Sequence, residues 1–213
     1  LVYFKIDYKE FRRKIIALLE SKGIPSGKYT IDRPARETIN SAKKYMEETL
    51  HYSSQDIKEI MNQVNAAVIE TERVAAEQAT PVTNVDKLLQ FGKQKGLLQI
   101  VVTYNTHAMA QLTLERAGIA QYIDGVVARD DVENPKPDPS HINSAATRFN
   151  IETDECFMVG DHSNDIDMGK GWGCQTIGVK SQYELNSVSD ADIIVNQETM
   201  YEEIARIIKS RLN

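Results

Sequence analysis

Apolar positions along the chain follow two different patterns, and the change between them falls at Thr80 and Pro81. Before this point apolar residues recur every three to four positions, the spacing of one face of an α-helix. The pattern predicts a helix from Tyr8 that ends before Gly23, a second over residues 35–50, and a longer one from Ser54 to about residue 79. Because no strand-like run interrupts them, the first third is expected to form a small helical bundle.

Beyond Pro81, short apolar runs alternate with helical segments. Such alternation is typical of a parallel sheet that helices cover on both faces, and ligands bind such sheets at the carboxyl ends of the strands. We therefore predict an α/β fold, a doubly wound parallel sheet, joined to the helical first third. Strands are expected over residues 97–102, 122–128, 156–159, 176–179 and 192–195, and helices over 85–95, 108–117, 140–149 and 200–212.

Composition and charge narrow the range of partners. The chain is 41% hydrophobic and 26% charged, with a formal net charge of -6. A nucleic-acid partner is not expected, because binding to it calls for a clustered basic face. No run of about 18 apolar residues occurs, so no membrane partner is expected either. A small phosphorylated substrate is compatible with this charge, since one lysine and one metal ion can hold it. Neither the composition nor the charge of the chain indicates its oligomeric state.

Cysteine usage bears on the cellular compartment. The two cysteines, Cys156 and Cys174, lie in apolar surroundings without metal-ligand spacing, so we expect two reduced core thiols. No signal peptide with a basic start and an apolar middle is found, and a cytoplasmic location is expected. The sequence begins at Leu1 rather than at a methionine.

The first strand end that carries candidate functional side chains is the one after Val102. Thr103 and Asn105 place a hydroxyl and a carboxamide just before a predicted helix, whose free backbone N–H groups favour an anion. The alternative is a simple helix cap, a common use of these residue types.

A second strand end carries two carboxylates. The strand at 156–159 runs into a glycine turn with Asp161 and Asp165 four positions apart, so both can face one point above the sheet. Hard oxygen ligands of this kind suit Mg²⁺, which usually keeps several waters and adds phosphate oxygens of a substrate. The alternative is a turn with a helix cap at Asp161 or Ser163. His162 is expected to be a loop residue, because imidazole is a poor ligand for magnesium.

A third feature is the segment Asn-Pro-Lys-Pro-Asp-Pro at residues 134–139. Its prolines prevent helix or central strand, so Lys136 is expected on a stiff loop near the edge of the sheet. An ammonium there can neutralise a phosphate or a carboxylate. Taken alone, the segment fits equally well a solvated lysine in a proline turn.

In chain order, these three features resemble the second, third and fourth motifs of the haloacid dehalogenase (HAD) superfamily. The resemblance covers about residues 80–197, and the helical segment before it is similar to the family's α-helical cap. The Thr-x-Asn form of the second motif resembles phosphoglycolate phosphatase-like members. The matching residues are Thr103 and Asn105 for the second motif, Lys136 in Lys-Pro-x-Pro for the third, and Asp161 and Asp165 for the fourth.

The resemblance implies a cap domain over residues 8–79 and a HAD-like core formed by 80–213 together with 1–7. It also implies a Mg²⁺-dependent phosphatase that hydrolyses a small phosphate monoester, such as phosphoglycolate, through an aspartyl-phosphate. The substrate would then be a small phosphorylated metabolite. In this scheme Thr103 and Lys136 are catalytic, Asn105 binds substrate, and Asp161 and Asp165 hold the metal.

The family's first motif, a strand followed by Asp-x-Asp, has no counterpart in this sequence. In the family its first aspartate attacks phosphorus and its second acts as general acid and base. Either the residues at Leu1 are the tail of a motif that lies upstream, or Val2–Phe4 is the strand and Lys5-Ile6-Asp7 a degraded motif. We favour the first, because the second places a lysine ammonium beside the metal. In both cases the chain as given is expected to be inactive.

Other classes of function remain as alternatives. A non-catalytic HAD-like binding protein, or an inactive fragment, would keep affinity for magnesium and phosphate without hydrolysis. A phosphoaccepting receiver domain shares the doubly wound sheet, but it has no place for the helical insertion or the late carboxylate pair. A dinucleotide-binding domain is disfavoured, because no Gly-x-Gly-x-x-Gly opens a helix.

Overall fold

The computed structural model describes residues 1–4, 6–181 and 188–212. The chain divides into two compact units. One unit comprises Phe4–Gln78, and the other Leu1–Tyr3 with Ala79–Asn213. The compact units thus separate at Phe4 and at Ala79, whereas the cap domain implied by the resemblance begins at residue 8. Each unit is described by itself.

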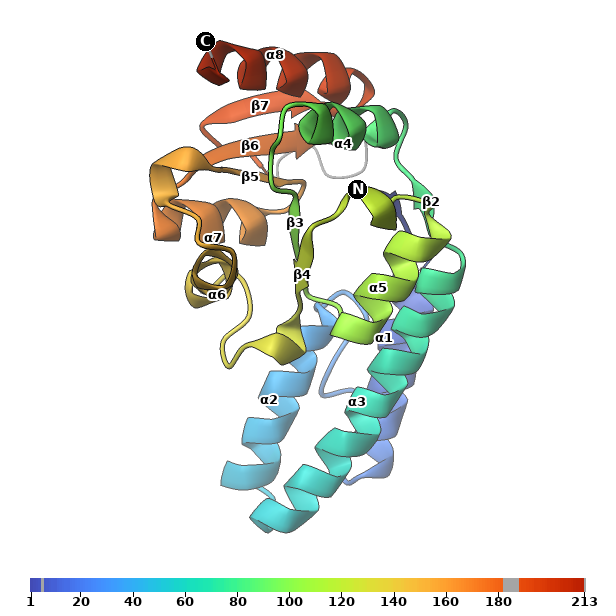
Figure 1. Cartoon of the computed structure of the whole chain (residues 1–213). Helices are drawn as coiled ribbons and strands as arrows, with labels where there is room; N and C mark the ends of the chain where they lie inside the picture. The colour runs from blue at the N-terminus through green and yellow to red at the C-terminus, as the bar shows by residue number, and fades with distance from the viewer. Residues whose placement is uncertain (5, 182–187, 213) are drawn as a thin grey trace. The chain divides into compact units, whose positions relative to one another are not determined.

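The helical unit contains α1 (Tyr8–Ser21), α2 (Ala35–Glu48) and α3 (Ser54–Glu77) (Figure 1). Asp7 caps α1 by accepting a hydrogen bond from the backbone N–H of Glu10 at 2.9 Å, and Ser53 caps α3 through the N–H of Asp56 at 3.1 Å. Such caps pair backbone donors that would otherwise lack partners at a helix start. The apolar stripes of the three helices enclose one core, which includes Ile15, Leu19, Ala42, Met46 and Val64.

The α/β unit alternates helices and parallel strands over most of its length. Two-residue strands β1 (Val2–Tyr3) and β2 (Thr80–Pro81) pair antiparallel at its start. The other elements are α4 (Val85–Gln94), β3 (Ile100–Val102), α5 (His107–Arg116), β4 (Gly125–Val127), α6 (Ser140–Phe149), β5 (Phe157–Gly160), α7 (Ser163–Trp172), β6 (Gln175–Lys180), β7 (Ile193–Asn196) and α8 (Met200–Leu212).

Parallel strands form two sheets in this unit. β3 pairs with β4, with Val101 opposite Val126. β5 pairs with β6 and β6 with β7, with Val159 opposite Ile177. Within the described residues, no ladder joins β3 to β5. Each of these two strands therefore has one edge without a strand partner in the described part of the chain.

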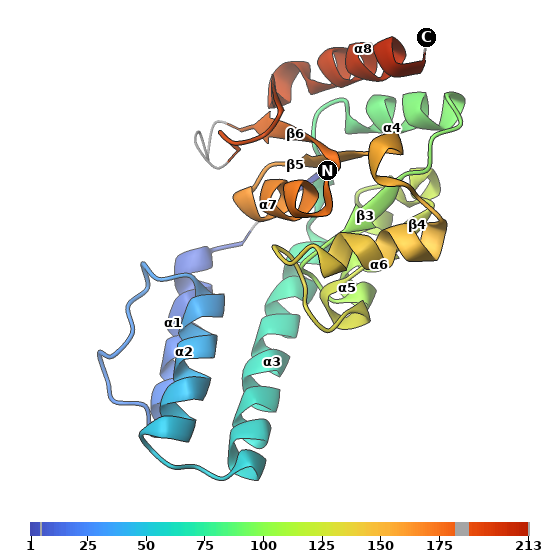
Figure 2. The same ribbon diagram turned by 90° about the vertical axis from the view of Figure 1, so that its left-hand side faces the viewer.

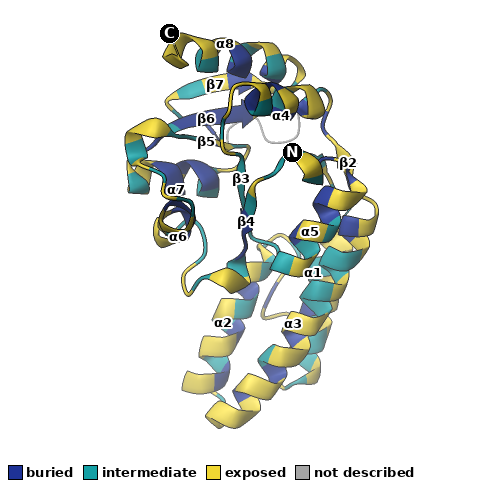
Figure 3. Cartoon of the chain, in the orientation of Figure 1, coloured by how far each residue is buried: buried dark blue, intermediate teal, exposed yellow. Residues whose placement is uncertain are grey.

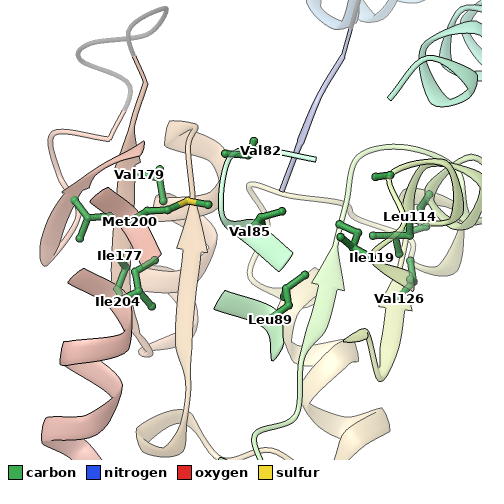
Figure 4. Close-up of a cluster of buried hydrophobic side chains, with 14 residues drawn as sticks. Val82, Val85, Leu89, Leu114, Ile119, Val126, Ile177, Val179, Met200 and Ile204 are labelled. Carbon is green, nitrogen blue, oxygen red and sulfur yellow. The ribbon is translucent and has the colours of Figure 1, made fainter. Parts of the chain in front are cut away.

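Helices cover the strands on both faces, as predicted for a doubly wound α/β fold. One apolar cluster brings together α4, α5 and α8 with strands β4, β6 and β7 (Figure 4). A second cluster brings α6 and α7, which run side by side, against β3 and β5 (Figure 2). Its members include Met158, Met168 and Cys174, and Cys156 packs against it. Both cysteines are free thiols.

Burial differs sharply between the strands of the two parallel sheets. The four interior residues of β6 are buried, whereas all three residues of β3 are half-buried (Figure 3). In β5, the side chain of Val159 is 42% exposed. Strands in the middle of a doubly wound sheet are normally buried on both faces. β3 and β5, like β4 and β7, end their sheets within the described residues, and none of these four strands is as fully buried as β6.

The structure shortens some of the predicted strands, and it bears on the alternative that the first motif is degraded. The run at 122–128 is a strand only over Gly125–Val127, and a 3₁₀ turn over Ala120–Tyr122 precedes it. Val2–Tyr3 pairs antiparallel with Thr80–Pro81, so it is not the parallel strand that a degraded first motif requires. Lys5, the proposed degraded position, lies outside the described residues. None of the described helices combines the length and apolar character needed to cross a membrane.

Candidate functional site

Lys136 joins two segments at the carboxyl ends of the strands. Its Nζ lies 2.5 Å from Oδ1 of Asp165 and donates a second hydrogen bond to the carbonyl oxygen of Val102 at 3.2 Å. The side chains of Lys136 and Asp165 are 16% and 8% exposed, so little water screens the pair. The ammonium thus connects the end of β3 with the first turn of α7.

Asp165 has a tightly defined place beside Gly160. A Cβ atom added to Gly160 would lie 2.2 Å from the Cβ of Asp165, so only glycine leaves room for this carboxylate. The second oxygen of Asp165, Oδ2, accepts the backbone N–H of His162 at 3.3 Å. His162 caps α7, because its Nδ1 accepts the backbone N–H of Asn164 at 3.1 Å. The His162 ring therefore serves as the N-terminal cap of α7.

Asp161 lies in the turn between β5 and α7, and it is exposed. The amino group of Leu1 is close enough for its charge to interact with Asp161, Asp165 and Lys136. The beginning of the described chain therefore lies at the strand-end site.

Thr103 and Asn105 belong to a loop that the neighbouring strand holds in place. Val127 accepts the backbone N–H of Thr103 at 3.0 Å, which extends the β3–β4 ladder by one hydrogen bond. The hydroxyl oxygen of Thr103 accepts the N–H of Asn105 at 3.2 Å. Arg129 then donates its backbone N–H to the carbonyl of Asn105 at 3.2 Å, and its Nη1 to the carbonyl of Tyr104 at 2.7 Å.

His107, the first residue of α5, is tied to the same turn after β4. Its backbone N–H bonds to Oδ1 of Asp130 at 2.8 Å, and its Nδ1 lies 2.7 Å from Oδ2 of Asp131. Burial raises the pKa of Asp131, but the N–H of Ala128 and the His107 ring together hold it below its ordinary value. These contacts make His107 a structural link between the two loops.

The residues at the strand ends fit a magnesium ion in part. In the described part of the chain, no three or more His, Cys, Asp or Glu residues are placed to hold a metal. Mg²⁺, however, is commonly bound through one or two carboxylates, with waters and phosphate oxygens completing the shell. Asp161 is an exposed carboxylate here, and both oxygens of Asp165 have hydrogen-bonding partners. The metal assignment of Asp161 and Asp165 stays a prediction.

Sequence reasoning missed two residues that organise the site. Arg129 holds the loop after β3, and His141 is a fully buried residue of α6. The Nδ1 of His141 accepts the backbone N–H of Lys136 at 3.0 Å, and its Nε2 lies 3.1 Å from the carbonyl oxygen of Val127. Neither belongs to a motif. The one available signal was the position of His141 on the apolar stripe of a helix that follows Pro139.

Parallel strands with helices on both faces place this chain in the doubly wound α/β class, in which ligands bind at the carboxyl ends of the strands, where these polar side chains lie. Residues 26–179 match the model of the haloacid dehalogenase-like hydrolase family. This segment is more than half of the chain. The chain therefore belongs to the haloacid dehalogenase-like hydrolase family.

Curated relatives resemble part of the chain. Pyrophosphatase PpaX of Bacillus velezensis is 34% identical over 108 residues, which cover 51% of this chain and 48% of that protein. Phosphoglycolate phosphatase of Escherichia coli is 35% identical over 103 residues, covering 47% of this chain and 41% of that protein. The matches thus span about half of the length of these relatives or less.

Solved structures share the fold over nearly the whole chain. β-Phosphoglucomutase from Clostridium difficile superposes with a TM-score of 0.69 at 15% identity, covering 97% of this chain and 93% of that one. A predicted phosphoglycolate phosphatase from Haemophilus somnus superposes with a TM-score of 0.64 at 17% identity, covering 92% and 91%. At these identities the likeness supports the fold, and the α/β fold predicted from the sequence is confirmed.

Proposed function

We propose that this chain acts in the Mg²⁺-dependent hydrolysis of a small phosphate monoester, with phosphoglycolate as the first substrate to test. The observation that carries the proposal is the Lys136 ammonium, 2.5 Å from the Asp165 carboxylate and 3.2 Å from the carbonyl that ends β3. A fixed cation at a strand end suits a phosphoryl group. A relative named as a phosphoglycolate phosphatase points to the same chemistry.

Each predicted residue has a role in this proposal. The hydroxyl of Thr103 donates to a phosphoryl oxygen, and Asn105 orients the bound group. Lys136 offsets negative charge on the phosphoryl oxygens as the transition state forms. When bound, Mg²⁺ would neutralise phosphoryl oxygens and align the reacting groups. Asp161 offers a carboxylate for that ion, while Asp165 acts by holding Lys136.

The nucleophile is proposed to come from a segment upstream of Leu1. β3 and β5 each have an edge without a strand partner in the described residues, and Val159 of β5 is 42% exposed. A strand between β3 and β5 would pair these edges and bring Asp-x-Asp to the site. These features favour an upstream motif over a degraded one.

The chemistry then proceeds in two steps. The first aspartate of the upstream motif attacks phosphorus, so that a carboxylate–phosphorus bond forms and the ester P–O bond breaks. The second aspartate gives its proton to the leaving oxygen and later takes one from the attacking water. Water releases phosphate from the aspartyl-phosphate and restores the carboxylate. The helical unit is proposed to act as the cap that excludes water from the first step.

Comparing this chain with the protein translated from the reading frame extended upstream tests the proposal. The extended protein is expected to hydrolyse phosphoglycolate, or another member of a panel of phosphorylated metabolites, with Mg²⁺ and not with EDTA. This chain should show no turnover. In the extended protein, Asp161→Ala should abolish turnover, whereas Asp154→Ala, an exposed carboxylate at the opposite end of β5, should not.

The outcomes separate the enzyme from the alternative function. Full turnover by the Asp161→Ala variant would contradict the assignment of the site. Phosphate binding without hydrolysis of any metabolite in the extended protein would favour a non-catalytic binding protein. The proposed partner is a small metabolite rather than a nucleic acid, given the net charge of -6. A cytoplasmic location, supported by the two free thiols, belongs to the same proposal.

A further inference from the structure

His141 is a buried histidine with two hydrogen-bonding partners. Its side chain has no exposed surface, and it lies in the first turn of α6. Nδ1 is 3.0 Å from the backbone nitrogen of Lys136, and Nε2 is 3.1 Å from the carbonyl oxygen of Val127. A buried polar group is costly unless it is paired. Both nitrogens of this ring are paired.

The partners determine the protonation state of the ring. The Lys136 backbone nitrogen is a donor, so Nδ1 must present a lone pair. The Val127 carbonyl is an acceptor, so Nε2 must carry the proton. His141 is therefore a neutral imidazole in the Nε2–H form. Burial lowers its pKa, which favours the same neutral state.

The ring lies within a chain of contacts that runs from Thr103 to Asp165. The carbonyl of Val127 accepts not only from His141 but also the backbone N–H of Thr103, at 3.0 Å. Lys136 continues the chain at the other side, since its Nζ contacts Asp165. One imidazole thus links the backbone that carries the Thr103 hydroxyl to the backbone that carries the Lys136 ammonium.

We propose that His141 is a positioning residue, which fixes Lys136 relative to Thr103 for phosphate binding. This inference rests on the proposed function of the site, but it concerns a residue outside every motif of the sequence. The neutral ring acts as a spacer of fixed length between two backbone groups. A protonated ring would have no lone pair for Lys136, and it would add a positive charge beside a cation. The charged groups that act on the ring are Lys136 and Asp131.

Two variants separate positioning from simple packing. His141→Gln keeps one acceptor and one donor at a spacing close to that of the ring nitrogens, but it cannot become charged. His141→Leu keeps apolar bulk and removes both hydrogen bonds. Ile142→Ala is the matched control, because this buried neighbour on the same helix has no polar contact to lose. It should lower the thermal midpoint of unfolding without changing the affinity for phosphate.

Three measurements on this chain test the inference. Imidazole ¹⁵N shifts should show a neutral Nε2–H ring for His141 at pH 7. Calorimetric titration with inorganic phosphate and Mg²⁺ should give affinity about tenfold weaker for His141→Leu. The affinity of His141→Gln should stay near that of the unchanged chain. Hydrogen exchange at the Lys136 amide should accelerate in the leucine variant and not in the glutamine variant.

The results distinguish failure of this inference from failure of the proposed function. If the unchanged chain binds no phosphate, the proposed function loses support, while amide exchange still decides whether His141 fixes Lys136. A charged or Nδ1–H ring, or unchanged exchange in His141→Leu, would overturn the inference. So would phosphate affinity that falls equally in Ile142→Ala, since packing alone would then account for the loss.

Discussion

Removing the ammonium of Lys136 is expected to destabilise the α/β unit far more than removing an ordinary surface lysine. In the Lys136→Met variant the aliphatic stem remains, so the change removes the charge and its hydrogen bonds to Asp165 and to the carbonyl of Val102. The Asp165 carboxylate, 8% exposed, would keep the N–H of His162 at 3.3 Å but lose its cation at 2.5 Å. Asp165 then becomes a buried charge whose counterion is gone, with the hydrogen bond from His162 left to offset part of the cost.

The magnitude follows from this burial. Breaking a buried ion pair by removing one partner typically costs about 3–5 kcal/mol, because the remaining charge is left desolvated. An exposed pair is worth roughly 0.3–0.5 kcal/mol. Lys44 and Glu48 form such a pair on α2, at 3.7 Å with side chains 71% and 61% exposed. Lys44→Met should therefore change the free energy of unfolding by less than about 0.5 kcal/mol.

Urea denaturation in EDTA, followed by circular dichroism, gives the free energies of unfolding. A second change, Asp165→Asn, removes the charge while keeping the shape and an acceptor for His162. The double variant should be more stable than Lys136→Met alone, with a coupling energy of at least about 1 kcal/mol. If Lys136→Met costs no more than Lys44→Met, the ion pair has no energetic role and the reasoning is wrong.

Three further predictions concern the neighbours of this pair. Gly160→Ala should cost about 1–3 kcal/mol and weaken phosphate binding, measured by thermal unfolding and calorimetry, because its Cβ would overlap Asp165. Burial depresses the pKa of His141 in the folded chain. As the pH falls, His141 is therefore protonated in the unfolded chain before it is protonated in the folded chain. The free energy of unfolding should therefore fall as the pH drops below about 6.5, and less steeply in urea titrations of His141→Gln. Arg129→Met removes the hydrogen bond to the Tyr104 carbonyl and should weaken phosphate binding about threefold by calorimetry.

Local sequence signals were enough to predict many of the elements. The helix expected over residues 140–149 is observed as Ser140–Phe149, because Pro139 precedes it and Asn150 ends it in a left-handed conformation. The strand expected from residue 97 begins only at Ile100. Gln99 explains the difference, since its side chain bonds to the carbonyls of Leu89 and Tyr122 rather than facing one side of a sheet. Such contacts depend on segments distant in the sequence.

The site shows the same division between local and tertiary information. Strand-end patterns identified Thr103, Lys136 and Asp165 as candidates, and the structure brings Lys136 into contact with Asp165 across 29 positions of sequence. His141 could not be predicted in this way. Histidine on the apolar stripe of a helix has many uses, and its role here depends on where the carbonyl of Val127 lies.

The exposed edges of β3 and β5 permit a direct test of the proposed upstream strand. A peptide with the upstream residues, added to this chain, should pair with both edges and cover Val159, which is 42% exposed. Because such a peptide binds the folded state, it should raise the free energy of unfolding by about 2.7 kcal/mol at a hundredfold excess over its dissociation constant. A peptide with proline at alternate strand positions loses ladder donors and should have no effect. Equal stabilisation by both peptides would show that β3 and β5 do not receive a strand, and the proposed source of the nucleophile would be wrong.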